Sequence, residues 1–143
     1  MKAATLTRPA EPSFGPGIAE LEAGLIDPEQ FDHQAHVFVA WSYLAEYPLA
    51  ESIQRFTAAL RRLTVKLGAS DKYHETITWF YLIEIEKRRN AETSRSWPAF
   101  VLENADLLRR GGDVLRQHYS PALLASPLAR EKFVLPDLPQ SPA

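Results

Sequence analysis

The chain has 143 residues, of which 45% are hydrophobic and 24% are charged, the balance of one globular domain. A net charge of −2 with no basic stripe disfavours nucleic-acid binding, and the absence of cysteine excludes disulfides and thiolate metal sites. No apolar run approaches the roughly 20 residues of a membrane span, and the Pro-rich start lacks the apolar core of a secretory signal. We therefore expect a cytoplasmic protein with no membrane or nucleic-acid partner.

The N-terminal part predicts a flexible arm followed by short helical pieces. The prolines within residues 1–16 block regular structure there, and apolar residues then recur at helical spacing over 18–25. Asp27 followed by a proline is typical of a helix start. Asp32 is a second candidate cap, with Phe31 placed as a hydrophobic staple.

Two longer helices are predicted next. Residues 33–47 are apolar on nearly every side, as in a central, buried helix, and Pro48 ends this segment. Residues 49–67 carry one apolar stripe opposite arginines and a lysine, and Gly68 follows as a C-terminal cap. Because this stripe holds only aliphatic side chains and phenylalanine, we expect the second helix to be a scaffold that takes no part in the site.

A third longer helix is predicted over residues 72–89, with Asp71 as its cap. Shorter helical pieces follow a polar loop over 90–96, and two Ser-Pro pairs each combine a capping serine with a first-turn proline. No alternating strand pattern occurs. The sequence thus predicts an all-α, single-domain irregular helical bundle of about three longer and several short helices. The domain spans residues 17–137, and a flexible tail covers 138–143.

Three of the four histidines occur in two short motifs. The first is F-D-H-Q-A-H at residues 31–36, with His33 and His36, and the second is Y-H-E-T-I-T at residues 73–78, with His74. At about 100° per residue, His33 and His36 lie on one helical face, and His74 begins the apolar stripe of its own helix. Both motifs lie at helix starts, where the positive end of the helix dipole favours a neutral imidazole. The sequence therefore predicts that the three rings meet at one end of the bundle.

Neutral imidazoles are good ligands for zinc, iron, copper or nickel. We therefore expect His33, His36 and His74 to bind a divalent transition metal of unknown identity. Glu75 is a candidate fourth ligand, general base or partner that orients a histidine. The alternative is that these histidines are structural and hydrogen-bond to the backbone or to carboxylates. His118 is either a further ligand or, as we favour, a surface histidine at a helix end.

Other polar groups flank the second motif. Tyr73 and Thr78 join Glu75 as candidate catalytic residues, because their hydroxyl groups lie within a turn of His74 along the chain. A threonine hydroxyl more often bonds back to its own helix, and we favour that interpretation for Thr76 and Thr78.

The two motifs resemble those of an uncharacterised family of small bacterial all-α proteins. The shared marks are F-x-H-x-x-H and Y-H-E-T-I-T, here Phe31 to His36 and Tyr73 to Thr78. The segments 119–121, 128–130 and 133–137 are also similar, so the resemblance covers residues 18–137. It implies no particular reaction. The layout is also similar to helical-bundle metal proteins of the DinB type, which use three histidines with a different spacing.

The sequence thus favours a small soluble helical protein with a histidine-rich metal site. Such a protein could be a metal-dependent enzyme that acts on a small molecule. A metal-free small-molecule binder or acid–base enzyme using the same histidines is the first alternative. A structural or interaction protein without catalysis is the second. The sequence also leaves a homo-oligomer open.

Overall fold

The computed structural model describes residues 15–89, 96–109 and 112–139, and in these ranges it contains helices and no strand. The prediction of an all-α bundle with three longer helices is confirmed. The predicted N-terminal arm, polar loop and tail lie largely outside the described ranges. No helix within those ranges combines the length and apolarity that crossing a membrane requires.

The described residues form nine α-helices and two short 3-10 helices. In chain order these are α1 (Ile18–Ala23), η1 (Pro28–Gln30), α2 (His33–Glu46), α3 (Leu49–Lys66), η2 (Ser70–Lys72), α4 (Glu75–Arg89), α5 (Trp97–Glu103), α6 (Ala105–Leu108), α7 (Asp113–Arg116), α8 (Pro121–Leu124) and α9 (Pro127–Glu131).

Four helix starts follow the predicted capping signals, namely those of η1, α2, α8 and α9. The Asp32 carboxylate accepts a hydrogen bond from the Ala35 N–H at 2.9 Å and caps α2. The ring of Phe31 meets the ring of His36 edge-on at 3.9 Å between centroids, which places the predicted staple across the first turn. The hydroxyl groups of three serines cap α5, α8 and α9 in the same way: Ser96, Ser120 and Ser126.

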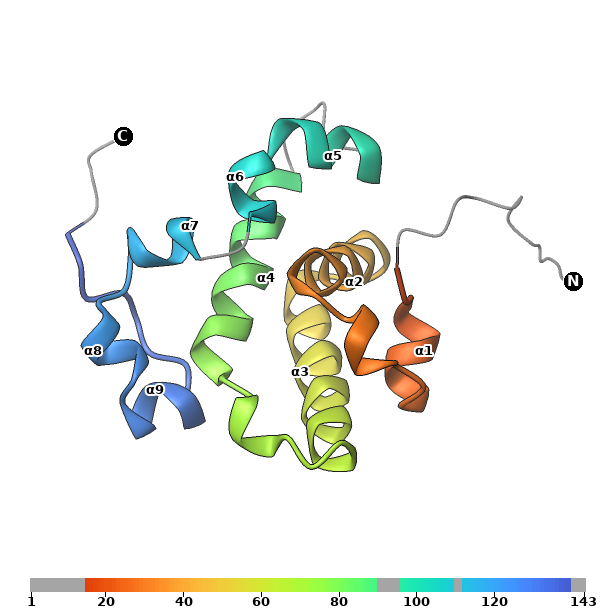
Figure 1. The fold of residues 1–143 in the computed structure, drawn as a ribbon. Helices are drawn as coiled ribbons and strands as arrows, with labels where there is room; N and C mark the ends of the chain where they lie inside the picture. The colour runs from red at the N-terminus through yellow and green to blue at the C-terminus, as the bar shows by residue number, and fades with distance from the viewer. Residues whose placement is uncertain (1–14, 90–95, 110–111, 140–143) are drawn as a thin grey trace, which may run out of the picture.

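Helices α2, α3 and α4 pack against one another and form the core, with α4 at the centre (Figure 1). Tyr43 of α2, Phe56 of α3 and Ile85 of α4 are almost fully buried between these helices. Helix α1 covers α2 and α3, whereas α7, α8 and α9 lie on the opposite side of α4 in Figure 1. The buried apolar side chains of the three long helices thus supply the main hydrophobic stabilisation.

The start of α4 differs from the prediction. Asp71 does not cap a helix beginning at residue 72, because Ser70 to Lys72 form η2 and Tyr73 is extended. Helix α4 begins at Glu75, and His74 occupies the capping position: its ring Nδ1 accepts a hydrogen bond from the Ile77 N–H at 3.2 Å. The imidazole of His74 therefore caps α4, whereas the sequence predicted that the Asp71 carboxylate would be the cap.

Residues 119–138, here called the C-terminal segment, fold back along α4. The Tyr119 hydroxyl donates to the Val134 carbonyl at 2.6 Å. The Asp137 carboxylate accepts from the backbone N–H of Ser120 at 2.8 Å and from its hydroxyl at 2.6 Å. These contacts close the segment into a loop whose inner side faces the start of α4.

Candidate functional site

The three motif histidines line one cavity, of about 550 Å³, between α2, α3 and α4. Its volume falls within the range of about 300–1,000 Å³ that is usual for small-molecule sites. Most of its wall is apolar, with aliphatic side chains from all three helices. We call it the histidine cavity, and it is lined by Pro28, Phe31, His33, His36, Val37, Ala40, Phe56, Leu60, Leu63, Thr64, Leu67, Ala69, Lys72, Tyr73, His74, Ile77, Thr78 and Tyr81.

His33 is held in place by α6 and α4. Its Nε2 lies 2.9 Å from the carbonyl oxygen of Leu107, which accepts the Nε2 proton. The ring also meets the ring of Tyr81 edge-on, at 5.2 Å between centroids. In the neutral ring, a proton on Nε2 leaves a lone pair on Nδ1. In that tautomer the Nδ1 of His33 is an acceptor with no hydrogen-bond partner among the described residues.

His36 differs from the other two histidines because neither ring nitrogen hydrogen-bonds to any residue within the described ranges. Burial, with a smaller contribution from the neighbouring His33, lowers the pKa of His36 from its usual 6.5 to about 4. The ring is therefore neutral at pH 7 and presents one N–H donor and one lone pair. The ring is half-buried and lines the cavity, so its nitrogens are available to a ligand that enters it.

His74 is fully engaged by the protein. Its Nε2 donates to the Leu124 carbonyl of α8 at 2.7 Å, while its Nδ1 accepts the Ile77 N–H that begins α4. Burial lowers the pKa of His74, and only the neutral ring can serve as donor and acceptor at once. His74 thus joins the C-terminal segment to the start of α4 and has no unused ring nitrogen.

This arrangement bears on the expected metal site. Among the described residues, no three histidine, aspartate or glutamate side chains are arranged to hold a metal ion. A metal ligand must offer an unused imidazole lone pair, and His74 uses both of its nitrogens. The three histidines as they lie do not fit a shared metal, and the metal site stays a prediction.

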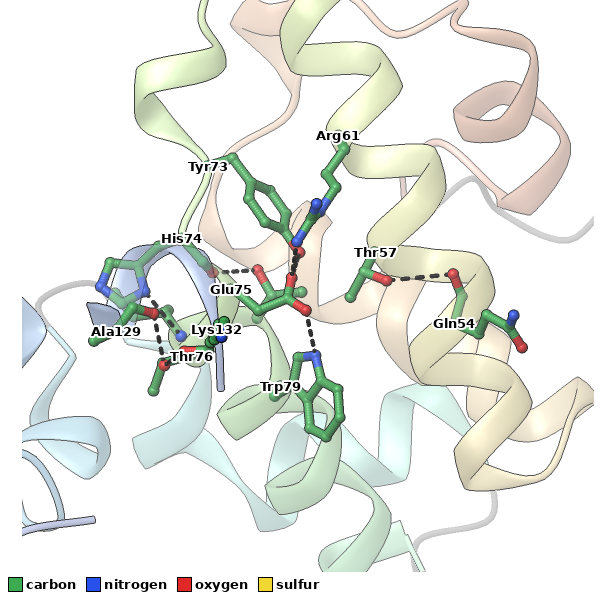
Figure 2. A network of polar contacts seen from close by, with 12 residues as sticks. Gln54, Thr57, Arg61, Tyr73, His74, Glu75, Thr76, Trp79, Ala129 and Lys132 are labelled. Carbon is green, nitrogen blue, oxygen red and sulfur yellow. Dashed lines mark hydrogen bonds and ion pairs between the residues drawn. The ribbon is translucent and has the colours of Figure 1, made fainter. Parts of the chain in front are cut away.

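Glu75 is the centre of a separate polar cluster (Figure 2). Its Oε1 accepts hydrogen bonds from the Tyr73 hydroxyl and from Arg61 of α3, the latter at 2.8 Å, and its Oε2 accepts from the Trp79 indole at 3.0 Å. Burial alone raises the pKa of this carboxyl, but the bonds from Tyr73 and Arg61 outweigh burial and lower it. Glu75 is thus ionised, and it is not part of the cavity wall.

The two threonines of the second motif also bond internally. The Thr78 hydroxyl donates to the His74 carbonyl at 2.8 Å, one turn back in its helix. The Thr76 hydroxyl lies 2.7 Å and 2.9 Å from the carbonyls of Ala129 and Lys132, and it accepts the Val134 N–H at 3.1 Å. The interpretation that threonine bonds to its own helix is confirmed for Thr78. It is wrong for Thr76, which ties α4 to the C-terminal segment.

The predicted site residues therefore separate into two groups. The cavity wall contains all three histidines with Tyr73 and Thr78, whereas Glu75 lies in the neighbouring cluster. His118 is not part of the wall, and its ring packs against Phe80 at 5.3 Å between centroids. The catalytic roles assigned to Tyr73, Glu75 and Thr78 stay predictions.

Sequence reasoning missed one whole wall of the site. The expectation that the helix at residues 49–67 takes no part is wrong, because Phe56, Leu60 and Leu63 of α3 line the cavity. A stripe of aliphatic side chains looks the same whether it packs against a core or encloses a hollow, so the sequence held no signal for this difference. Tyr81 could have been found from the sequence, because it lies three residues after Thr78 and so shares the helical face that faces the cavity.

Comparison of the chain with protein-family models, with curated protein sequences and with solved structures finds no match. The geometry of the cavity and its surroundings is therefore the basis of the functional argument.

Proposed function

We propose that the protein binds a small, mainly apolar molecule in the histidine cavity without the help of a metal. The observation that carries this proposal is His36, a neutral imidazole in the wall of a cavity of about 550 Å³, whose ring nitrogens have no hydrogen-bond partner among the described residues. A cavity with an apolar wall and a few polar groups is the usual form of a small-molecule site.

The polar contacts come from His33 and His36. The Nδ1 of His33 accepts a hydrogen bond from the ligand, and His36 offers one donor and one acceptor. A ligand with an apolar body and a hydroxyl or carbonyl group satisfies both parts of the wall. Binding then supplies a hydrogen-bond partner that no described residue provides for His36.

The pKa of His36 favours binding over acid–base catalysis. A general base works best when its pKa lies near the working pH. The pKa of His36 is lowered to about 4, which makes the ring a weak base at pH 7. We therefore assign His36 the role of a hydrogen-bonding contact.

The test uses two probes, planar indole and linear 1-dodecanol, followed by NMR of the imidazole and Tyr81 ring signals. We expect at least one probe to shift the signals of His36 and Tyr81. The Ala40→Leu variant fills the cavity and is expected to abolish these shifts, because Ala40 is 2% exposed and lines the wall.

Ala59→Leu is the matched control, since Ala59 is 1% exposed on α3 and is not part of the wall. Ala59→Leu places a larger side chain in a packed core and is expected to cost about 1–3 kcal/mol of stability. The side chain introduced by Ala40→Leu extends into the empty cavity, so we expect the stability of that variant to be nearly unchanged. Probe binding should survive in Ala59→Leu. Failure of both probes to shift any cavity signal contradicts the proposal.

A titration with zinc separates this proposal from the metal interpretation. We expect no stoichiometric zinc binding by the purified protein in calorimetry. Stoichiometric zinc binding that disappears in His36→Leu would contradict the metal-free proposal and support the site predicted from the sequence.

A further inference from the structure

The charges around the histidine cavity have one sign. Within the described residues, Lys72 is the single formally charged side chain of the wall, and no aspartate or glutamate lines it. The imidazole of His36 is neutral at pH 7. The electrostatic potential of this wall therefore favours a ligand that carries a negative charge.

Lys72 lies at the mouth of the cavity, because it lines the wall and is also exposed to solvent. Its ammonium group makes no ion pair with any residue in the described ranges. The backbone of η2 is fixed on both sides: the Lys72 N–H donates to the Ala69 carbonyl at 2.9 Å, and Arg130 donates to the Asp71 carbonyl. The lysine therefore extends from an anchored backbone.

A second hollow, of about 600 Å³, shares Tyr73 and Thr64 with the histidine cavity and provides a contrast. We call it the outer hollow. It contains two arginines, but it also contains two carboxylates, and these charged residues are Arg61, Arg130, Asp71 and Glu131. Because Glu75 also pairs with Arg61 at 2.8 Å, the outer hollow has no net preference for an anion. An acidic group is therefore expected at Lys72 rather than at the arginines.

Building on the proposed function, we propose that the ligand is an amphipathic carboxylate anion. Its apolar body lies among α2, α3 and α4, and its carboxylate pairs with Lys72 at the mouth. This orientation keeps the charge near water, where it is not desolvated, and places the apolar part against the aliphatic wall. Lys72 is then the residue that selects an acid over the corresponding alcohol.

The test compares dodecanoate with 1-dodecanol, which share the chain and differ in the charged group. For a partly exposed ion pair we expect dodecanoate to bind at least about threefold more tightly in calorimetry at low salt. The ratio of the two affinities should fall towards one in 1 M salt, where such a pair is screened.

In Lys72→Gln we expect the ratio of the two affinities to fall to about one, because the variant loses affinity for dodecanoate. Lys132→Gln is the matched control, because Lys132 is an exposed lysine outside the cavity wall, and it should keep the preference for the acid. Equal binding of acid and alcohol by the native protein, or loss of the preference in Lys132→Gln, overturns the carboxylate proposal and leaves the cavity proposal intact. Binding of neither dodecanoate nor 1-dodecanol overturns the carboxylate proposal, and it overturns the cavity proposal as well when indole also fails to bind.

Discussion

The two histidine motifs each lie at the start of a helix, and the two helices α2 and α4 pack against each other, yet the motifs use their polar atoms differently. In the second motif, the side chains of His74, Glu75 and Thr76 are all hydrogen-bonded to other parts of the chain. In the first motif, His36 has no hydrogen-bond partner on its ring within the described residues, and His33 keeps one unused nitrogen. Polar atoms that the fold has already paired hold the structure together, whereas unpaired ones remain for a ligand.

The largest expected effect comes from Thr76→Val. Thr76 is fully buried, and its hydroxyl serves two carbonyls and one N–H of the C-terminal segment. Because the valine leaves these buried groups without partners, we expect a loss of about 3 kcal/mol in the free energy of unfolding, measured with urea. Thr57→Val is the control, since within the described part of the chain the Thr57 hydroxyl hydrogen-bonds only to the Gln54 carbonyl of its own helix, at 3.3 Å. Equal losses in both variants would show that Thr76 is not a structural anchor.

The second-largest expected effect is the difference in stability between variants of one histidine from each motif. His74→Leu removes the cap of α4 and the bond to the Leu124 carbonyl, and we expect it to cost about 2 kcal/mol of stability. His36→Leu replaces an unpartnered ring with an apolar side chain, and we expect a change below about 1 kcal/mol. Probe binding should show the reverse order, with His36→Leu more affected than His74→Leu. If His36→Leu proves the less stable variant, the division between the two motifs is wrong.

A smaller effect depends on pH. The pKa of Glu75 is lowered in the folded protein, so its contribution is present above the unfolded pKa, close to 4.5, and is lost as the pH falls through the folded value. We expect Glu75→Gln to cost about 1 kcal/mol at pH 7, because the Arg61 partner is half exposed. The difference in unfolding free energy between the native protein and the variant should shrink between pH 5 and 3. A difference that stays constant over this range contradicts the assigned role of the carboxylate.

The helix caps and helix ends that depend on short-range contacts were predictable from the sequence. Asp32, Ser120 and Ser126 bond to backbone groups three residues away, so short-range patterns identify them. The stripe of α3 likewise predicted a helix that ends at Gly68, where φ is +67°. These elements depend on contacts within one or two turns.

The docking of the C-terminal segment and the histidine cavity could not be predicted, because both depend on contacts between residues far apart in the sequence. His74 meets Leu124, 50 residues away, and Thr76 meets Ala129, 53 residues away. No spacing within the Y-H-E-T-I-T motif indicates that the C-terminal segment folds onto it. The same holds for the hollow between α2, α3 and α4, which exists because their apolar side chains do not fill the space that they enclose.

The most direct test of the central claim is an NMR titration of the ring nitrogens of the three motif histidines, with and without 1-dodecanol. We expect His36 to titrate with a pKa of about 4, and we expect probe binding to shift its ring-nitrogen signals more than those of His74, whose two ring nitrogens are already hydrogen-bonded. A probe that shifts His74 and leaves His36 unchanged would contradict the account, because the ligand-binding role would then belong to the second motif.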